Sequence, residues 1–524
     1  PGAAGGAPLP RRKFRDMTPM SARRYAVTPP TPDEITRAAL NALGPGEAGW
    51  LVGGCLRDEL LGRRVRDVDI ALDGRPEPLA RALADRFGGV VYATSDVFGT
   101  WRVIVGDLHI DVAVLRGGPP GDPPDPATRA LRLEADLRAR DVTVDALARP
   151  LEGHDIVDPL SGLSDLAAGR LRLCSPASLD DDPLRVLRLA RLARVFELVP
   201  DAAATEAAFR AAPGLARVSG ERVRDELCSL LGTRAASVAL RDLAVWGALD
   251  VVLPEVDRLR GVGQNPYHHL DVFEHTLEAL TYTMGVVAQL GGRRFLATPE
   301  ETGLPGVEPL APVAWAVLLH DIGKPVVRVV DDQGRVIFWH HDETGRQMCA
   351  DIGRRFNLSN RFVEYVGTLV RQHLRLGFLT REQPLTRRAL ARYRRDVSPW
   401  VFESVVVSLC DRLATRGEKT SLSSMARHYR LARTVWTEVN KVPAPQLLSG
   451  DDVMQVLGIE PGPAVGQALD ALEEEIEAGE VMDADGARAF LLDWWGRDDE
   501  KAKEEDGRAT GRPRAQGASD QADA

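Results

Sequence analysis

Two glycines and two alternating aspartates near the amino end constrain this chain more than any other feature. Gly53-Gly54-Cys55-Leu56-Arg57-Asp58 follows an apolar run, and Asp67-Val68-Asp69 opens the next apolar stretch. Residues i and i+2 of a β-strand project from the same face, so a strand here directs both aspartates toward one point. Glycines let backbone N–H groups approach a phosphate, and Mg²⁺ is often held by one or two carboxylates together with substrate phosphates. The pattern therefore predicts a metal-dependent phosphate site.

A third carboxylate, Asp111, lies in the apolar segment His109-Ile110-Asp111-Val112-Ala113. Two metal ions about 3.5–4 Å apart can activate a 3′-hydroxyl and stabilise a leaving pyrophosphate. A lone Asp-x-Asp pair is more often an exposed strand or turn, but the glycine turn and the third acid favour nucleotidyl transfer. We expect Asp67, Asp69 and Asp111 to be catalytic, with Mg²⁺ bound by Asp67 and Asp69.

The composition is that of an ordinary globular protein. The 524 residues suffice for several domains, and 44% are hydrophobic and 27% charged. The net charge of −10 argues against uniform coating of a nucleic acid, but eight arginines against four acidic residues from Arg185 to Arg224 form a basic region. Five scattered cysteines without a CxxC pair favour reduced thiols and a cytoplasmic setting. We see no apolar run of about 18 residues and no signal peptide, so no membrane association is expected.

Short apolar runs separated by turn residues predict an α+β unit over residues 33–150. Helices are expected at 33–43 and 79–87, and strands at 50–52, 68–72, 90–92, 100–105 and 109–115. The Gly- and Pro-rich segment 117–126 is expected to be a loop.

Beyond Asp180 the pattern becomes helical, because apolar residues recur at helical spacing from Leu184 to Ala193. We expect helices to continue to about Leu259, a further unit from Gly263 to Arg416 and a last helical stretch to Trp495. The polar, Gly- and Pro-rich ends at 1–32 and 496–524 are expected to be disordered.

The glycine turn and the aspartate pair resemble the head of the class II tRNA nucleotidyltransferase and bacterial poly(A) polymerase family. Further motifs follow in the family's order. They are Arg140-Asp141-Val142-Thr143-Val144-Asp145-Ala146-Leu147 (the ribose-contacting motif), Asp158-Pro159 with Gly162 and Asp165-Leu166 (the hinge), Asp181-Asp182-Pro183-Leu184-Arg185-Val186-Leu187-Arg188 (the neck helix), Glu221-Arg222-Val223-Arg224-Asp225-Glu226-Leu227 (the last neck motif), and Leu447-Leu448-Ser449-Gly450-Asp451-Asp452 with Pro461-Gly462-Pro463 and Gly466 (the carboxy-terminal block). The resemblance covers roughly residues 35–495.

The resemblance implies a nucleotide site in which Gly53, Gly54 and Arg57 hold the triphosphate and Asp141 lies near the ribose. The whole set it implies is Gly53, Gly54, Arg57, Asp58, Arg140, Asp141, Asp182, Arg185, Arg188 and Arg191. Asp182 and Arg185 are three residues apart and are expected to share one helix face. In the family such a pair serves as the protein template that selects C and A. Seen alone, the pair would be read as an ordinary surface ion pair.

Two departures from the family pattern bear on specificity. The ribose-contacting motif usually ends in Phe-Thr-Ile-Asn, whereas this chain has Val142 and Asp145 in place of the aromatic residue and the amide. We therefore expect the Asp145 carboxylate to place a negative charge beside the nucleotide. The segment 117–126 is also shorter than the family's flexible loop, which leaves CC-only or A-only addition open.

A second metal centre is indicated by His320-Asp321-Ile322-Gly323-Lys324-Pro325 after an apolar run. Adjacent His and Asp suit a divalent metal that accepts nitrogen and oxygen donors. Seven of the ten histidines lie between His268 and His373, and the additional candidate ligands are His275, His341, His373 and Asp411.

This order of ligands resembles the HD phosphohydrolase superfamily over about 266–416. His340 stands where the pattern often has Gly; between His340 and His341 we favour His341, and we interpret His268 and His269 as bystanders. The resemblance implies a bound Mn, Ni, Co, Fe or Mg ion and phosphodiesterase or phosphatase activity on cyclic or terminal phosphates. The alternative is an HD fold kept only as a scaffold.

The resulting fold class is α+β: a nucleotidyltransferase head with a small mixed sheet (33–150), an all-α neck and body (151–262), an all-α HD domain (263–416) and a helical C-terminal region (417–495). We expect a template-independent RNA nucleotidyltransferase that adds CCA, or part of it, to tRNA 3′ ends from CTP and ATP, with no obligatory protein partner. The alternatives are a poly(A) polymerase, an HD phosphohydrolase whose head only binds RNA, and a non-catalytic scaffold.

Overall fold

The computed structural model describes residues 29–95, 99–115, 125–379, 385–439 and 446–509. Its internal contacts divide the chain into two compact units, residues 1–211 and 212–524. The division falls inside the segment predicted as one helical neck and body, because the first neck helices pack with one another and with the head.

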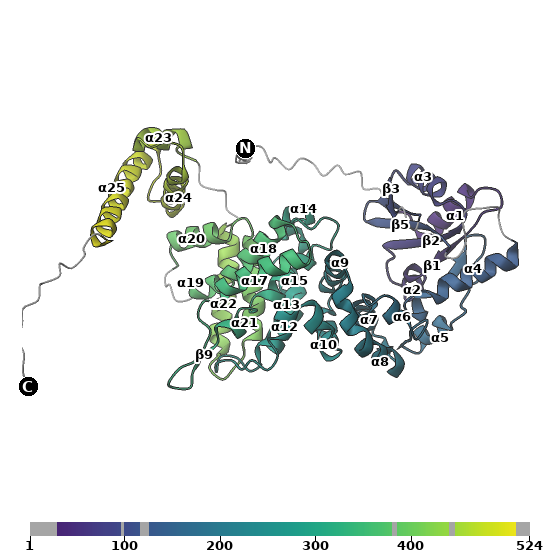
Figure 1. Ribbon diagram of the computed structural model, residues 1–524. Helices are drawn as coiled ribbons and strands as arrows, with labels where there is room; N and C mark the ends of the chain where they lie inside the picture. Colours follow the sequence, from purple (N-terminus) through teal and green to yellow (C-terminus); the bar gives the residue numbers. More distant parts are fainter. Residues whose placement is uncertain (1–28, 96–98, 116–124, 380–384, 440–445, 510–524) are drawn as a thin grey trace, which may run out of the picture. The chain divides into compact units, whose positions relative to one another are not determined.

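A six-stranded mixed sheet forms the centre of the first unit, in the order β3-β4-β5-β2-β1-β6 (Figure 1). The strands are β1 (Ala48–Val52), β2 (Asp67–Asp73), β3 (Val90–Ser95), β4 (Thr100–Val105), β5 (Leu108–Val114) and β6 (Ala148–Pro150). β2 and β5 pair in parallel, and the other neighbours pair antiparallel. A parallel pair requires a crossover, which α3 and the β3–β4 hairpin supply. The predicted α+β head is confirmed.

Alternation along β2 divides its side chains between two cores. Ile70 and Leu72 pack with α1 and α3 on one face, whereas Ala71 packs with α4 on the other. Asp67 and Asp69 share the parity of Ala71 and therefore project from the α4 face. The helices of the head are α1 (Pro32–Ala42), α2 (Gly54–Leu60), α3 (Pro76–Phe87) and α4 (Pro126–Arg138).

The predicted helices at 33–43 and 79–87 and all five predicted strands are confirmed within a few residues. The sequence prediction missed α4, although its buried Leu133 and Leu137 are four residues apart. Most of the predicted loop 117–126, and the end segments 1–28 and 510–524, lie outside the described residues.

The neck within the first unit is a set of short helices with one two-stranded ribbon. Its elements are η1 (Thr143–Asp145), α5 (Gly162–Ala167), β7 (Arg170–Leu171), α6 (Ser178–Asp181), α7 (Arg185–Val195), β8 (Val199–Pro200) and α8 (Ala202–Ala211). The prediction that Asp182 and Arg185 share one helix face is wrong. Asp182 is extended, with φ −142° and ψ 94°, and ends α6, whereas Arg185 begins α7. Pro183 lies between them, and a proline disfavours the helical conformation in the residue before it.

In the part of the second unit that the structure describes, all elements are helical apart from a small β9–β10 hairpin (Val329–Val330 and Val336–Ile337). Its helices up to residue 439 are η2 (Ala212–Arg217), α9 (Gly220–Leu231), α10 (Ala236–Val245), α11 (Ala248–Val252), α12 (Pro254–Asp257), α13 (Val272–Gln289), η3 (Arg293–Phe295), α14 (Pro299–Thr302), α15 (Leu310–Leu319), α16 (Lys324–Val327), α17 (His341–Arg355), α18 (Asn360–Gln372), α19 (Arg375–Leu379), α20 (Arg387–Val397), α21 (Val401–Ala414) and α22 (Leu422–Val439).

Helix α15 is the centre of this unit, because all ten of its residues are buried. It packs against α13, α18 and α21. The segment Leu310–Val327 is apolar enough to resemble a membrane span by composition, but 83% of it is buried inside the protein. Its hydrophobicity is thus that of a core helix.

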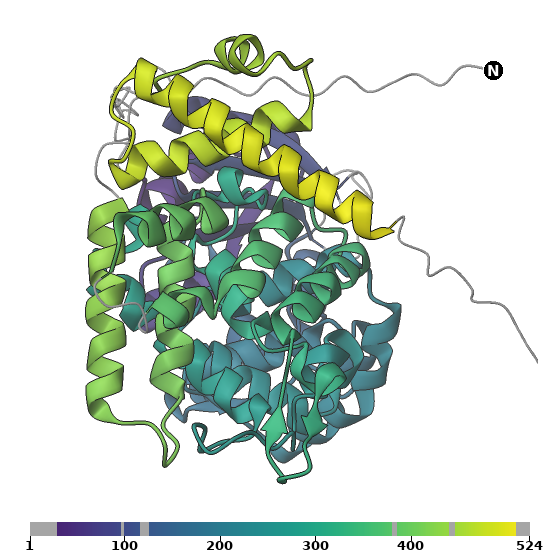
Figure 2. The same ribbon diagram turned by 90° about the vertical axis from the view of Figure 1, so that its left-hand side faces the viewer.

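The last three helices, at the yellow end of the chain in Figure 2, are α23 (Gly450–Leu457), α24 (Pro463–Ala478) and α25 (Ala484–Ala509). They pack against one another around a small apolar core of their own. Ser449 caps α23 through a reciprocal capping box with Asp452. Helix α25 extends to Ala509, into the segment after residue 495 for which the sequence predicted a disordered tail.

Candidate active site and candidate metal centre

The three predicted catalytic aspartates lie on the two parallel strands at the centre of the head sheet. In the β2–β5 register Asp69 is paired with Asp111 and Asp67 with His109. Paired residues of adjacent strands lie on the same face of a sheet. The structure therefore places Asp67, Asp69 and Asp111 on one face of the sheet, as the spacing predicted for Asp67 and Asp69.

Gly53 gives the strand-to-helix turn the room that this site needs. Its φ of +80° favours glycine. A Cβ at this position would lie 2.5 Å from Arg140 Nη1 and 3.2 Å from Asp69 Oδ2. The glycine turn, Arg140 and the buried end of the aspartate pair thus meet at one place.

The two aspartates of β2 have opposite electrostatic surroundings. Burial raises the pKa of Asp69 to about 6, and the neighbouring Asp111 carboxylate adds to the rise although Arg140 opposes it. A hydrogen bond from His109, whose Nδ1 is 3.3 Å from Asp67 Oδ1, lowers the pKa of the exposed Asp67. A half-buried carboxylate beside two others is stabilised by a cation, so the donor set fits a divalent metal.

Arg102 fixes the orientation of Asp111 from the neighbouring strand. It faces Asp111 in the β4–β5 register, and its Nε and Nη2 each donate to one carboxylate oxygen at 2.7 Å. Such bidentate pairs are the strongest carboxylate–guanidinium contacts. Arg102 had no role in the sequence prediction because it belongs to no recognisable motif.

Arg57 is buried rather than directed at solvent. It is 6% exposed, and its Nη1 donates to Asp145 Oδ1 at 2.5 Å. Its Nη2 donates to Asp58 Oδ1 at 2.8 Å, and its guanidinium lies 3.8 Å from the centre of the Phe196 ring. Arg57 therefore ties the glycine turn to Asp145 of the ribose-contacting motif and to the end of α7. The triphosphate contact predicted for Arg57 stays a prediction.

The predicted base-selecting arginine is also engaged by the protein. Arg185 Nη1 donates to the oxygens of Ser178, at 3.1 Å to the carbonyl and 2.9 Å to the hydroxyl, and Nη2 donates to the Ala139 carbonyl at 2.9 Å. Asp182 Oδ1 accepts a hydrogen bond from Leu184 N at 3.3 Å, just before the first residue of α7.

Arg188 and Arg191 lie on the same helix α7. Arg188 is paired through Nε with Asp141 Oδ2 at 2.8 Å. Burial opposes ionisation of Asp141, but the charges of Arg188 and Arg185 outweigh it and lower its pKa. The first turns of α7 are thereby joined to the ribose-contacting motif.

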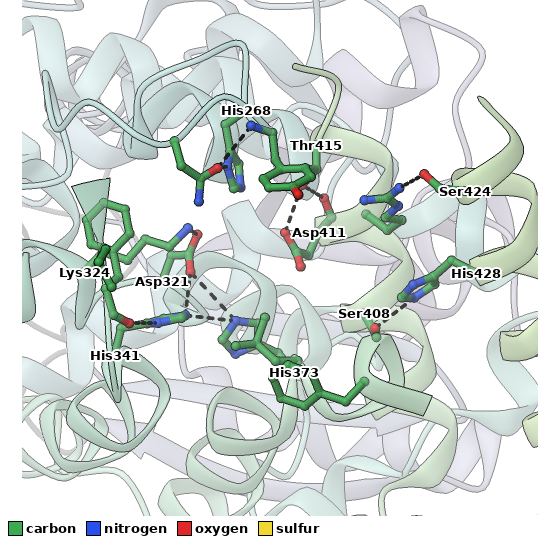
Figure 3. Close-up of a pocket in the computed structure, with 18 of the residues that line it drawn as sticks. His268, Asp321, Lys324, His341, His373, Ser408, Asp411, Thr415, Ser424 and His428 are labelled. Atoms are coloured by element: carbon green, nitrogen blue, oxygen red, sulfur yellow. Dashed lines mark hydrogen bonds and ion pairs between the residues drawn. The ribbon is translucent and has the colours of Figure 1, made fainter. Parts of the chain in front are cut away.

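The second predicted centre is a cluster of imidazoles and carboxylates at the ends of five helices. Figure 3 shows the members that face a cavity, Asp321, His341, His373 and Asp411. His275 lies on α13, His320 and Asp321 at the end of α15, His341 at the start of α17, His373 at the end of α18, and Asp411 on α21. All six predicted ligands are brought together, in groups whose donor atoms lie within 4.8 Å of one another. Gly323 permits this, because a Cβ there would lie 2.1 Å from the His341 carbonyl oxygen.

The hydrogen bonds of the four imidazoles fix which nitrogen faces the centre. Each Nδ1 lies 2.7–3.3 Å from a backbone carbonyl, to which it must donate; the carbonyls belong to Ala414, Val317, Phe338 and Val370. Each Nε2 then presents a lone pair. These lone pairs face one another at 3.3 Å between His275 and His320 and at 3.4 Å between His341 and His373. Two nitrogens at this distance need a shared proton or a cation between them, and a divalent metal ion fits this set of nitrogen and oxygen donors.

Asp321 lies between the two imidazole pairs. Its Oδ2 is 3.1 Å from His320 Nε2 and 3.5 Å from His275 Nε2, whereas its Oδ1 is 3.4 Å from His341 Nε2. Lys324 Nζ donates to the same Oδ2 at 2.6 Å. Burial opposes ionisation of Asp321, but His320 and Lys324 outweigh it and hold its pKa well below the usual value. The carboxylate can therefore bridge two cation positions.

Of the histidines near the cluster, some belong to the groups of candidate metal ligands and others lie outside them. His341 is buried in the cluster, whereas His340 has φ +59° and is exposed outside it, in agreement with the choice made from the sequence. His268 was interpreted as a bystander, but it groups with His275 and Asp411. The sequence prediction missed His268 as a candidate ligand because it lies in a turn before α13, away from any motif. His269 is outside these groups and lies near Glu278.

The cluster opens into a cavity of about 790 Å³. Asp321, His341, His373 and Asp411 line it together with side chains of α21 and α22. A cavity of this size accommodates a nucleotide-sized ligand.

Family models match three parts of the chain. They are the head domain of poly(A) polymerases over residues 49–172, a probable RNA- and SrmB-binding site of polymerase A over 201–259, and the HD domain over 272–416. These matches agree with the order of motifs in the sequence.

Full-length relatives decide the family. The A-adding tRNA nucleotidyltransferase of Deinococcus radiodurans is 38% identical over 471 residues, which cover 87% of this chain and 98% of that relative. The CC-adding tRNA nucleotidyltransferase of Thermus thermophilus is 36% identical over 457 residues, which cover 85% of this chain and 93% of the relative. The chain belongs to the tRNA nucleotidyltransferase family.

Solved structures of CCA-adding enzymes share the fold of this tRNA nucleotidyltransferase. The complex of a CCA-adding enzyme with ATP superposes with a TM-score of 0.57 at 18% identity, over 88% of this chain and 94% of that one. The Thermotoga maritima CCA-adding enzyme complexed with tRNA gives a TM-score of 0.51 at 18% identity, over 88% and 98% of the two chains.

Proposed function

We propose that this tRNA nucleotidyltransferase adds C and A residues, as all or part of CCA, to tRNA 3′ ends from CTP and ATP without a nucleic-acid template. The observation that carries the proposal is the pairing of Asp69 with Asp111 across β2 and β5, with Asp67 on the same face. Carboxylates so placed suit Mg²⁺, which in nucleotidyl transfer neutralises the triphosphate and lowers the pKa of the attacking hydroxyl.

The protein's own residues position the two reactants. The tRNA 3′-oxygen forms a bond to the α-phosphorus. The bond from the α-phosphorus to the oxygen that bridges the α- and β-phosphates breaks, and pyrophosphate leaves. Asp111, oriented by Arg102, is placed to direct the 3′-hydroxyl. Gly53 and Gly54 admit the triphosphate beside Arg140. Asp141 supports the ribose, and Asp182 at the end of α6 and Arg185 at the start of α7 select the base from two separate helices rather than from one helix face.

Incorporation on three tRNA substrates tests this function. The tRNAs end at the discriminator base, after the first C and after the second C, and CTP and ATP are supplied separately. Release of pyrophosphate with addition limited to C, A or both supports the proposal and defines which part of CCA is made. Long A tails on these tRNAs and on unstructured RNA would instead identify a poly(A) polymerase.

We propose a second activity for the HD region, a metal-dependent phosphohydrolase that removes cyclic or terminal phosphates from RNA 3′ ends. Four imidazoles with inward Nε2 atoms and a central Asp321 suit one divalent ion on each side of that carboxylate. A free 3′-hydroxyl is the substrate of the head, so the two activities act on one terminus in sequence.

Hydrolysis of bis-p-nitrophenyl phosphate by the full chain tests this activity. We expect turnover with added Mn²⁺, Ni²⁺ or Co²⁺, and its loss in Asp321→Asn with nucleotide addition retained. Hydrolysis without pyrophosphate release from CTP or ATP would instead indicate that the head only binds RNA. The five free cysteines are in keeping with a cytoplasmic setting for both activities.

A further inference from the structure

The cavity of the HD centre has a second polar wall that belongs to α21 and α22. Figure 3 shows Ser424 and His428 on the side of the cavity away from Lys324 and His341. Helix α22 begins at Leu422, beyond the residues 272–416 that match the HD domain. The α22 part of this wall therefore lies outside the residues that match the HD domain, whereas the α21 part lies within them.

The wall carries two guanidinium groups that form no ion pair among the described residues, although the Asp411 carboxylate is near enough to Arg412 to act on its charge. Arg412 and Arg427 line the cavity, and neither has an ion pair among the described residues. The Nη2 atom of Arg412 donates to the Ser424 hydroxyl, and its Nε is buried without a hydrogen-bond partner. Nearby arginines differ in this respect, since Arg416 is paired with Glu278. A buried guanidinium donor without a hydrogen-bond partner indicates an anionic ligand.

His428 and Ser408 complete this wall with neutral polar groups. Their Nε2 and Oγ atoms lie 3.1 Å apart, and both side chains are buried. Burial lowers the pKa of His428 to about 4, so the imidazole is neutral near pH 7. The two residues can orient a ligand without adding a third positive charge.

Aromatic side chains supply the remaining kind of surface. Tyr267 and Phe378 line the cavity and are 50% and 51% exposed. Exposed rings beside a polar cavity are typical of sites that stack a nucleobase.

We propose that this cavity binds a ribonucleotide that carries two phosphoryl groups, one at the His/Asp cluster and the other on Arg412 and Arg427. The assignment rests on the proposed phosphohydrolase site for the first group and on the α21–α22 wall for the second. A free nucleoside 3′,5′-bisphosphate and the 3′-phosphorylated end of an RNA share this chemistry, because the last diester supplies the second phosphate of the RNA.

Calorimetric binding to the full chain tests the proposal without depending on turnover. Adenosine 3′,5′-bisphosphate and adenosine 3′-monophosphate are titrated at low temperature in the presence of Mn²⁺, and their integrity is checked afterwards. We expect the bisphosphate to bind about tenfold or more tightly, as a charge-assisted contact implies. Arg427→Gln and Arg412→Gln abolish this preference, whereas Arg430→Gln, on the same helix but outside the cavity, keeps it. Binding at the head is the same in these variants and drops out of the comparison.

Equal affinity for the two ligands, or a preference that survives both cavity substitutions, overturns the proposal. Arg427 is exposed, so its replacement leaves folding intact and keeps the test decisive. A 3′-phosphorylated hexaribonucleotide that binds as tightly as the bisphosphate identifies an RNA end, and its exclusion identifies the free nucleotide. A preference without any hydrolysis of bis-p-nitrophenyl phosphate would refute the phosphohydrolase function alone, and hydrolysis without a preference would refute the second-phosphate site alone.

Discussion

Arg57 Nη1 lies 2.5 Å from Asp145 Oδ1, and both side chains are almost fully buried. Asp145 stands where the related motif usually carries an amide, so the sequence predicted an extra anion beside the nucleotide. The structure pairs that anion with Arg57, whose other contacts are Asp58 and Phe196. The substitution is therefore compensated inside the protein, and it joins the glycine turn to the ribose-contacting motif.

Replacement of Asp145 tests this connection. Asp145→Asn keeps the shape but removes the charge, and we expect it to reduce the free energy of unfolding by about 1–3 kcal/mol. Asp145→Ala leaves Arg57 a buried cation with one partner fewer and costs about 3–5 kcal/mol. Urea unfolding measures both, with the exposed Asp107→Asn as control. A stability of Asp145→Asn equal to that of the wild type would mean that the pair contributes nothing.

Arg102 is predicted to act through Asp111 as a positioning residue. Arg102→Gln should lower kcat for nucleotide addition about 10- to 100-fold, the usual cost of losing a group that orients a ligand, and should leave KM for CTP nearly unchanged. Arg102→Lys keeps the charge and should restore part of the rate. A change confined to KM would place Arg102 on the nucleotide instead.

Substitutions at His341 and at its neighbour His340 provide a test of the metal centre and its matched control. His341→Ala should lower the metal content of the purified chain by about one ion and reduce its thermal stability, because one imidazole group then lacks a ligand. His340→Ala changes an exposed neighbour and should do neither. Elemental analysis after dialysis against Mn²⁺ gives the content directly, and equal metal content in the two variants would contradict the assignment.

Glu403 should make the stability of the second unit depend on pH. Burial raises its pKa to about 7, even though Ala297 N donates to its carboxylate. Because the pKa is higher in the folded than in the unfolded protein, the folded state binds more protons between these two pKa values. The free energy of unfolding therefore falls as pH rises from about 4.5 through 7. Glu403→Gln should therefore be more stable than the wild type at pH 8, by up to about 3 kcal/mol, and about equal to it at pH 5. Urea unfolding at the two pH values measures this. The same stability difference between Glu403→Gln and the wild type at both pH values would exclude titration of Glu403 as the cause.

The sequence was sufficient to predict candidate site residues where their arrangement depends on spacing along one helix or strand. The Asp67–Asp69 alternation, the acid at Asp111 and the histidine order all placed residues that the structure brings together. The α+β class followed from short apolar runs and was confirmed, with five of the six strands of the sheet predicted and β6 missed.

Residues that act across elements could not be found in this way. Arg102 meets Asp111 only through strand register, and His268 reaches Asp411 only through the packing of the turn before α13 onto α21. The break at Pro183 also defeated the three-residue spacing of Asp182 and Arg185, because spacing predicts a shared face only while the helix continues.

The central claim is that Asp69, with Asp67 and Asp111, supports nucleotidyl transfer to a tRNA end. The most direct measurement is pyrophosphate release with CTP or ATP on tRNA lacking CCA, compared between the wild type, Asp69→Asn and Asp107→Asn at several Mg²⁺ concentrations. We predict that the wild type and Asp107→Asn release pyrophosphate in step with tRNA extension, whereas Asp69→Asn loses about a thousandfold or more in rate. Extension by Asp69→Asn at the wild-type rate would contradict the account.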